Sequence, residues 1–299
     1  PSNAVVRARA PRLTTTHGRH LVRLYEDQTI LVINKPPEIP VHRGQGGFTR
    51  RETLEDVMQR AYPPPPGAPR SQQGFYFVHR LDMETSGCLL IAKNDPARDA
   101  LIRDFSARKI YKEYLAFVIG EVSWQKRVVK NPIRYVRAED EAEEEAPRSR
   151  VPWKSAPRTR KPPVLPGQKK GIALDESSTE GKACETHFEV LQRFKGCTLL
   201  RASPKTGRTH QIRVHLQAIG HPLVYDPLYG RQTALRLREF DLRSAGTERG
   251  DEVILTRLPL HAWKVRFTHP STQEVLRIEA PLPGDLKELL RILKKYRNP

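Results

Sequence analysis

The stretch "FVHRLDMETSGCLLIAKN", residues 77–94, places Arg80 and Asp82 two positions apart inside an otherwise mostly apolar run. The apolar segments at its two ends are typical of strands, and the "METSG" residues between them favour a tight turn. On a strand, residues two apart point to the same side, so the guanidinium could reach either the carboxylate or a phosphate. A carboxylate kept ionised in a semi-apolar cleft needs a cationic neighbour, which would also orient it as a nucleophile. On composition alone, a structural ion pair is the simpler interpretation.

The rest of the chain alternates between strand-like and helix-like patterns. Short strands surround an "EDQ" turn at residues 26–28, and two later hairpins turn at Lys195–Gly196 and at "HPSTQ" (269–273). Apolar residues at helical spacing, with Thr53 and Asp95 as N-cap residues, predict helices. Adjacent strands joined by short turns favour an α+β fold with a mostly antiparallel sheet. The predicted helices span residues 52–62, 95–108, 209–220 and 284–296.

The chain is strongly basic. It has 52 Lys and Arg against 34 Asp and Glu, a formal net charge of +18 and a sequence pI near 10.1. This balance is typical of a protein that binds a polyanion, and nucleic acid is the first candidate. Membrane binding is not expected, since the sequence has no long apolar run and no clear basic amphipathic helix.

Neither a metal site nor a nucleotide-binding loop is expected. The sequence has no GxxxxGK[ST], GxGxxG or HExxH motif. His210, His215 and His221 lie close in sequence, but a metal site usually needs a tighter set of ligands. The three cysteines are too few and too far apart for a disulfide framework, which favours a reducing compartment.

Two segments differ in composition from the rest. Residues 1–21 are expected to form a basic amino-terminal arm; the first 25 residues contain five Arg and no acid, as in transit peptides. Residues 137–180 are expected to be a charged insertion, disordered or extended, because an acidic run and a basic, proline-rich run cannot bury a core. A plain solvated loop is the alternative; Trp153 among basic residues favours RNA contact. Residues 22–299 would form the catalytic domain.

Four separated motifs resemble those of the RluA-like pseudouridine synthases. "HRLDMETSG" (79–87) is similar to the family's HRLDxxTSG signature without a mismatch, and "YKEYLAFVIGEV" (111–122) is similar to its KxYxAxVxG strand. "TGRTHQIRVHLQAIGHPLVYDPLYG" (206–230) resembles the family's most characteristic block. The segments at 180–194 and 260–283 resemble its later strands in order and spacing. The resemblance covers about residues 22–136 and 180–297.

The resemblance implies a pseudouridine synthase fold, with flanking helices and a central RNA-binding cleft, that isomerises uridine in RNA without cofactor or metal. It implies that Asp82 is the catalytic nucleophile, attacking the base or the ribose, and that Arg213 is its salt-bridge partner. Tyr114 would stack on the target base and help to remove the C5 proton, with Tyr111 as the less fitting alternative. The resemblance also implies that Arg80 fills the gap left by the extruded uridine. The further RNA contacts that we expect are Lys35, Arg208, His210 and Trp153.

Two departures from the family pattern affect the expected function. Glu38 stands where the family's early loop has a glycine, and an S4 domain is not expected before the catalytic part, which about 21 residues precede. Ribosomal RNA is the expected substrate, with tRNA or mRNA as alternatives. Ribosomal subunit precursors and assembly factors are possible partners. A second hypothesis is a ribosome assembly factor that uses the fold as a scaffold. The arm favours a mitochondrial location over a cytoplasmic or nuclear one.

Overall fold

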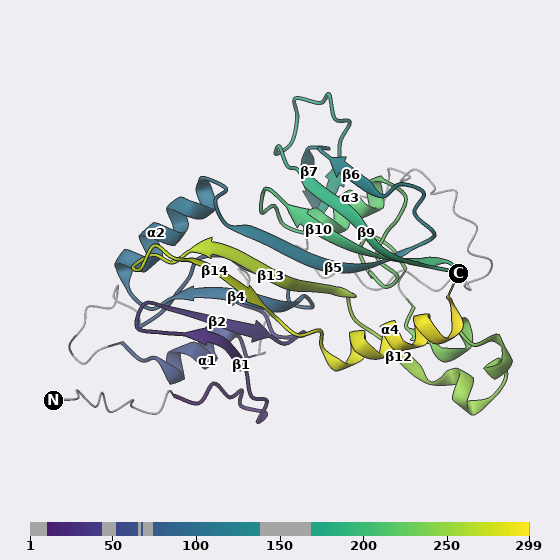
Figure 1. The fold of residues 1–299 in the computed structure, drawn as a ribbon, viewed down its shortest axis with the longest axis horizontal. Helices are drawn as coiled ribbons and strands as arrows, with labels where there is room; N and C mark the ends of the chain where they lie inside the picture. Colours follow the sequence, from purple (N-terminus) through teal and green to yellow (C-terminus); the bar gives the residue numbers. More distant parts are fainter. Residues whose placement is uncertain are drawn as a thin grey trace.

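A computed structural model describes the fold (Figure 1). It describes residues 11–43, 52–64, 67, 74–137, 169–231 and 233–298. Its main element is a ten-stranded sheet in which β1, β2, β4, β13, β5, β10, β9 and β6 lie in that order, while β14 pairs with β13 and β3 with β4. Only the β13–β4 pairing is parallel among the described pairs of this sheet, so the predicted α+β class with a mostly antiparallel sheet is confirmed.

The strands of the large sheet are short to medium in length. Their bounds are β1 Val22–Glu26, β2 Ile30–Lys35, β3 Tyr76–Phe77, β4 Ser86–Ala92, β5 Tyr111–Ile119, β6 Lys126–Val129, β9 Thr186–Phe194, β10 Cys197–Pro204, β13 Leu260–Thr268 and β14 Val275–Glu279. Two further pairs lie outside it: β7 Ile133–Arg137 with β8 Lys169–Ala173, and β11 Leu235–Arg236 with β12 Val253–Leu255.

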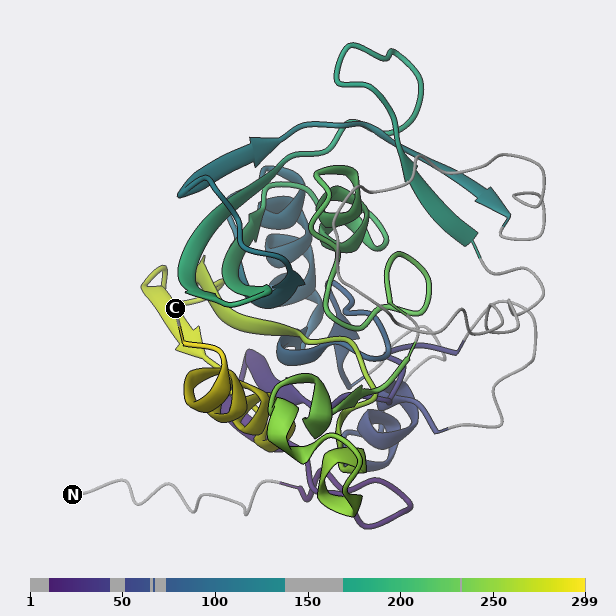
Figure 2. The same cartoon turned by 90° about the vertical axis from the view of Figure 1, so that its right-hand side faces the viewer.

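Within the described residues, four α-helices pack around the sheet: α1 Leu54–Ala61, α2 Asp95–Ser106, α3 Gln211–Ala218 and α4 Gly284–Tyr296. Helix α3 packs against β8, β9 and β10. Helices α1 and α2 lie at one end of the molecule and α4 at the other (Figure 1), and Figure 2 shows how strongly the sheet curves. In the described part of the chain, no helix has the length and apolar character needed to cross a membrane.

The central strand β5 separates two hydrophobic cores. Because side chains on a strand alternate between faces, Tyr114 and Ala116 join one buried cluster, while Leu115 and Phe117 join the other. The first cluster includes Ile212 from α3, and the second includes the buried residues of α4. Tyr114 therefore lies on the face of the sheet that α3 covers.

Most predicted helices and hairpins are present, with small shifts at their ends. Thr53 is the N-cap of α1 and shares a capping box with Asp56, as the sequence pattern predicted. The predicted cap of α2 was one residue too late: Asn94, and not Asp95, accepts the hydrogen bond from the Ala97 amide. Both residues favour caps, so the pattern alone could not distinguish them.

Parts of the predicted arm and of the predicted insertion belong to the folded body. Residues 11–21 pack on the body: Leu13 and Leu21 are buried, and the Thr16 amide donates to the Glu52 carboxylate. Residues 169–173 form β8, which pairs with β7 from Ile133↔Ala173 to Arg137↔Lys169. Residues 1–10 and 138–168, which carry the rest of both predictions, lie outside the described residues.

The turn that contains Glu38 keeps a conformation that suits glycine. Glu38 has φ 68°, in the left-handed region that residues other than Gly, Asn and Asp rarely adopt. The turn therefore keeps its backbone conformation although glutamate replaces the family's glycine, and the positive φ of Glu38 leaves local strain there.

Candidate active site

Asp82 lies in the loop between β3 and β4, and not at the end of a strand. The loop closes through a hydrogen bond of 3.1 Å from the Thr85 amide to the Asp82 carbonyl. β3 comprises Tyr76–Phe77 only, so the prediction that Arg80 and Asp82 lie on one strand and point to the same side was wrong. Gly87, the second residue of β4, has φ 115°, and an added Cβ would lie 2.2 Å from the Ala262 carbonyl oxygen on β13. The glycine of this motif is required by that close approach.

Arg213, on helix α3, is held by a buried carboxylate. Its Nε and Nη2 each donate a hydrogen bond of 2.8 Å to Asp226, a fork that fits the planar guanidinium. Asp226 is 0% exposed and also accepts the backbone N–H groups of Leu228 and Tyr229. The pKa of Arg213 is raised: burial opposes the charge, but Asp226, Asp82 and Tyr229 outweigh it. The guanidinium is therefore fixed in place and charged.

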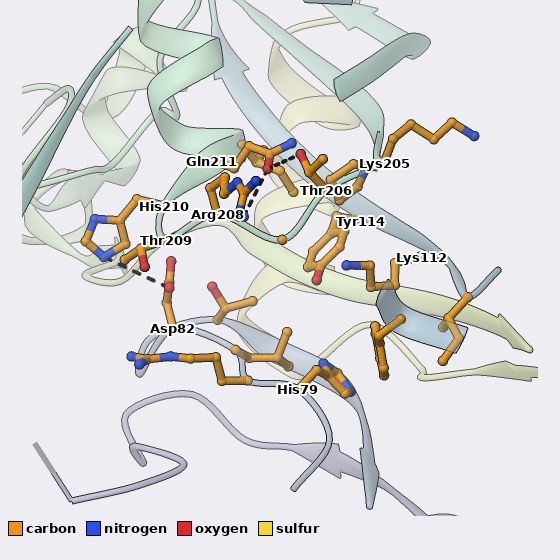
Figure 3. A pocket seen from close by; sticks show the side chains of 18 of the residues that line it. His79, Asp82, Lys112, Tyr114, Lys205, Thr206, Arg208, Thr209, His210 and Gln211 are labelled. Atoms are coloured by element: carbon orange, nitrogen blue, oxygen red, sulfur yellow. Dashed lines mark hydrogen bonds and ion pairs between the residues drawn. The ribbon is translucent and has the colours of Figure 1, made fainter. Parts of the chain in front are cut away.

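Asp82 faces this fixed guanidinium. Arg213 Nη1 lies 3.5 Å from Asp82 Oδ2. His210 Nε2 lies 4.0 Å from Asp82 Oδ1 (Figure 3). Neither contact is as short as the 2.8 Å hydrogen bonds from Arg213 to Asp226. The nucleophile candidate is thus oriented on both oxygens without being tightly held, and 22% of its side chain remains exposed.

The hydrogen bonds around His210 select one tautomer. The Tyr229 hydroxyl accepts the Gly171 N–H at 2.8 Å, which leaves its own proton free for His210 Nδ1 at 3.0 Å. His210 then carries its proton on Nε2, the nitrogen that faces Asp82. Burial lowers the pKa of His210 to about 4, although Asp82 opposes this shift. His210 is therefore neutral at physiological pH and presents an N–H to the carboxylate.

Tyr114 faces the same pocket from β5. Its neighbours across the sheet are Ala202 on β10 and Ala262 on β13, whose small side chains leave room beside the ring. Burial raises the pKa of Tyr114, and Asp82 raises it further. Tyr111, the alternative aromatic residue, is 45% exposed and is not among the residues that line the pocket.

The pocket has a volume of about 470 Å³, within the range of small-molecule sites, and Asp82, Tyr114 and Arg213 all line it. Asp82 is its single carboxylate among the described residues, so the pocket favours an anionic substrate. The cations that line it are Arg80, Arg108, Lys112, Lys205, Arg208 and Arg213.

Lys35 does not lie where RNA could reach it, contrary to expectation. Its side chain is 0% exposed, and its ammonium donates hydrogen bonds of 2.8 Å to the carbonyls of Pro36 and Met83. Burial lowers its pKa to about 7. Because Met83 directly follows Asp82, the hydrogen bond from Lys35 to the Met83 carbonyl stabilises the loop that carries Asp82.

Arg80 and Arg208 lie at the mouth of the pocket, where both are exposed. Arg208 Nε donates to the Ala183 carbonyl at 3.3 Å. Both guanidinium groups are accessible to an RNA chain that enters the pocket. Trp153, the remaining residue with an expected RNA contact, lies outside the described residues.

The three histidines of the 206–230 block do not converge. His215 is 0% exposed and contacts the Thr186 hydroxyl and the Asn131 carbonyl, while His221 contacts the Ile119 carbonyl. Among the residues that the structure describes, no three His, Cys, Asp or Glu side chains could hold a metal ion together.

Sequence reasoning missed Asp226 and Tyr229. Both lie in the "YDPLYG" segment, which the pattern predicts only as a loop. One signal in the sequence was available: a loop with polar side chains follows a helix that carries an arginine. The ion pair between Arg213 and Asp226 could not be predicted from it, because it depends on how the chain returns to α3. Lys112, on the same strand as Tyr114, was also missed.

Comparison with known proteins identifies the fold and the family. A family model described as RNA pseudouridylate synthase matches residues 29–218. The chain belongs to this family. It is 38% identical over 292 residues to the ribosomal large subunit pseudouridine synthase C of Salmonella typhimurium, covering 96% of this chain and 75% of the relative. The corresponding protein of Pasteurella multocida is 35% identical over 277 residues, covering 92% and 68%.

A solved structure supports the same fold. Human RNA pseudouridylate synthase domain containing 4 is 22% identical, with a TM-score of 0.61, covering 91% of this chain and 93% of that chain. The predicted resemblance to RluA-like pseudouridine synthases is thereby confirmed, and the protein is an RNA pseudouridine synthase, an isomerase that modifies RNA.

Proposed function

We propose that this protein isomerises uridine to pseudouridine in the RNA of the large ribosomal subunit, with Asp82 as the nucleophile. The observation that carries the proposal is the Asp82 carboxylate 3.5 Å from Arg213, in one pocket with Tyr114. The name of the relatives, ribosomal large subunit pseudouridine synthase, supports the choice of RNA. Ribosomal subunit precursors are the corresponding partners.

The target uridine must leave its stack before its glycosidic bond can be reached. Extruding a base costs a few kcal/mol, which an aromatic surface in the pocket and a group filling the vacated space can offset. Tyr114 supplies the aromatic surface, and the exposed Arg80 at the pocket mouth fills the space. Arg208 grips the phosphates that flank the target.

The reaction moves the C1′ atom of the ribose from N1 to C5 of uracil. Asp82 attacks the ribose C1′ or the base, the N1–C1′ bond breaks, and the freed uracil turns. C5 then bonds to C1′, and the bond that Asp82 formed with the ribose or the base breaks and restores the carboxylate. The C5 proton leaves, with Tyr114 placed to help remove it, and N1 takes up a proton. His210 and Arg213 hold the two oxygens of Asp82 in the orientation that attack requires.

The scaffold alternative is not favoured. A protein that only binds RNA does not need a carboxylate set at the base of a cationic pocket, where it repels phosphate. The grouping of Asp82 with Tyr114 and Arg213 in one pocket supports turnover instead. The role of assembly factors and the mitochondrial location stay predictions.

Pseudouridine mapping of total RNA, with and without the protein, tests the proposed substrate. We expect one or a few sites in large-subunit ribosomal RNA to lose the modification and to regain it with the wild-type protein but not with Asp82→Asn. Loss confined to tRNA would reject the ribosomal assignment while leaving the isomerase activity intact.

A further inference from the structure

Lys112 is a cation in the catalytic pocket that the proposed chemistry has not used. It lies two residues before Tyr114 on β5, so both side chains emerge on the same face of the sheet. Figure 3 shows its amino group directed toward the hydroxyl end of Tyr114. A methyl group added to Gly207 would lie 3.8 Å from Lys112 Nζ, so the amine reaches across to the loop that precedes α3.

The Lys112 ammonium has no carboxylate partner among the described residues. Its Nζ lies 5.6 Å from the centroid of the Phe105 ring, and its charge helps to lower the pKa of the neighbouring His79. Burial lowers the pKa of Lys112 to about 8, and no neighbouring charge offsets this shift. A partly buried cation without a counter-ion costs stability, so a group kept in this way is a candidate for contact with a substrate.

The uracil ring acquires negative charge during the reaction. If Asp82 attacks C1′, the electron pair of the N1–C1′ bond stays with the departing uracil and is shared by N1, O2 and O4. If Asp82 attacks the ring, the charge develops at C5 and O4 instead. In both routes the charge returns to Asp82 when the C5–C1′ bond has formed and the bond to Asp82 breaks. It reappears on the ring when the C5 proton leaves, and protonation of N1 removes it. A cation beside the ring stabilises this charge without being consumed.

We propose that Lys112 donates a hydrogen bond to a carbonyl oxygen of the target uracil and stabilises the negative charge that develops on the ring. The inference rests on the proposed isomerase function and adds a catalytic residue to it. The position of Lys112, on the same strand and face as Tyr114, places the ammonium beside the base rather than at the exposed rim. A phosphate contact would fit the rim better, because a charged diester stays close to water.

Three variants distinguish a contact of Lys112 with the uracil from a contact with an RNA phosphate. Lys112→Met removes the charge at similar length, Lys112→Arg keeps the charge, and Lys294→Met removes one charge from the exposed end of α4 as a matched control. Each variant is assayed with C5-tritiated RNA under single-turnover conditions, and its RNA affinity is measured at several salt concentrations. Activity of the wild type and of Lys294→Met establishes the isomerase itself, so an inactive wild type would contradict the proposed function and not the role of Lys112.

We expect Lys112→Met to slow the saturated single-turnover rate by about 100-fold, as for the loss of one donor to a developing charge. Its RNA affinity should stay within about threefold of the wild type, with the same salt slope. Lys112→Arg should recover part of the rate. A normal saturated rate with weaker binding and a shallower salt slope would show a phosphate contact and overturn the inference, as would wild-type behaviour throughout.

Two further measurements distinguish a loss of catalysis from a loss of folding in Lys112→Met. Removing an ammonium without a counter-ion should leave the Tm of Lys112→Met equal to or above that of the wild type; a lower Tm would indicate a structural role and contradict the inference. The pH profile of kcat/KM needs only the wild type and Lys112→Arg. An ammonium is present below its pKa, so the wild-type value should fall above about pH 8, whereas the arginine variant should keep its activity to higher pH.

The comparison with Lys112→Arg assigns the basic limb, because the buried Lys35, whose pKa burial lowers to about 7, and the other groups near the pocket are the same in both proteins. Burial lowers the pKa of His79 to about 3 and that of His210 to about 4, and it raises the pKa of Tyr114. An identical basic limb in Lys112→Arg would overturn the assignment. The other charged side chains that face the pocket are Arg80, Asp82, Arg108, Lys205, Arg208 and Arg213.

Discussion

The Arg213 guanidinium lies 3.5 Å from the Asp82 carboxylate, and a second, fully buried carboxylate fixes its position. Asp226 accepts two of the five N–H donors of Arg213, one from Nε and one from Nη2. The remaining nitrogen, Nη1, points to Asp82. Arg213 can therefore orient the Asp82 carboxylate through one nitrogen. It does not form the short pair of hydrogen bonds that would hold this carboxylate tightly.

Breaking the buried pair should destabilise the protein. Asp226→Asn leaves Arg213 with an incomplete counter-charge, and the free energy of unfolding should fall by about 3 kcal/mol. Urea unfolding measures this difference. Glu288→Gln is the matched control, because its pair with Arg291 on α4 is exposed and screened by solvent, so its loss should leave the free energy of unfolding nearly unchanged. Equal losses in both variants would contradict the structural role of Asp226.

The Tyr229 hydroxyl should matter to catalysis although it does not contact Asp82. Tyr229→Phe removes the donor to His210 Nδ1, so the imidazole no longer has one favoured tautomer. Loss of one hydrogen bond predicts a fall of about tenfold in kcat with little change in KM. Nitrogen-15 NMR of the histidine ring should show proton on Nε2 in the wild type and a mixture in the variant.

Tyr225→Phe is the control for this change, since the Tyr225 hydroxyl makes no hydrogen bond to the described residues. An unaltered tautomer in Tyr229→Phe, with a normal kcat, would show that Tyr229 only supports the fold of its loop.

Acid should weaken the fold before the carboxylates titrate. His79 Nε2 accepts the Leu90 N–H at 2.9 Å, and burial lowers the pKa of His79 to about 3, below its unfolded value near 6.5. Between these values the unfolded chain binds a proton that the native protein does not, so stability falls as the pH decreases. The free energy of unfolding, followed from pH 7 to pH 5, should fall less steeply in His79→Gln, whose amide oxygen can still accept the N–H.

The base of the charged insertion permits a defined deletion. Arg137 and Lys169 are paired in register, so Asn-Gly can replace residues 138–168 as a two-residue hairpin turn that preserves β7 and β8. If the six Lys and Arg in this segment contact phosphate, the salt dependence of RNA binding should become shallower. An unchanged slope, with an unchanged Tm, would exclude the segment from RNA binding.

The sequence allowed the hairpins and helices to be predicted where apolar periodicity and turn residues agree. The hairpin at Lys195–Gly196 and the cap at Thr53 are examples, because each depends on neighbours in sequence. β8 was missed because its five residues lie beside a proline-rich, basic run and carry few apolar side chains. They pair only because β7 offers a partner and Gly171 lets the strand approach α3, where a Cβ would lie 2.9 Å from Val214 Cγ2.

The sequence predicted some residues of the site correctly and others not. The motifs identified Asp82, Tyr114 and Arg213, which the structure places in one pocket. Lys35 was assigned to RNA because it is a cation in a motif, but its complete burial depends on the packing of distant segments. The partners of Arg213 and His210 come from a loop whose return path no local pattern specifies.

The most direct test of the central claim is tritium release from C5-labelled ribosomal RNA by Asp82→Asn. The amide keeps the size of the side chain but removes the charge that attack requires, so we expect no release above background. RNA affinity should stay within a few fold, because Arg80 and Arg208 at the pocket mouth are unchanged. Release at the wild-type rate would contradict the assignment of Asp82 as the nucleophile and, with it, the mechanism proposed for this pocket.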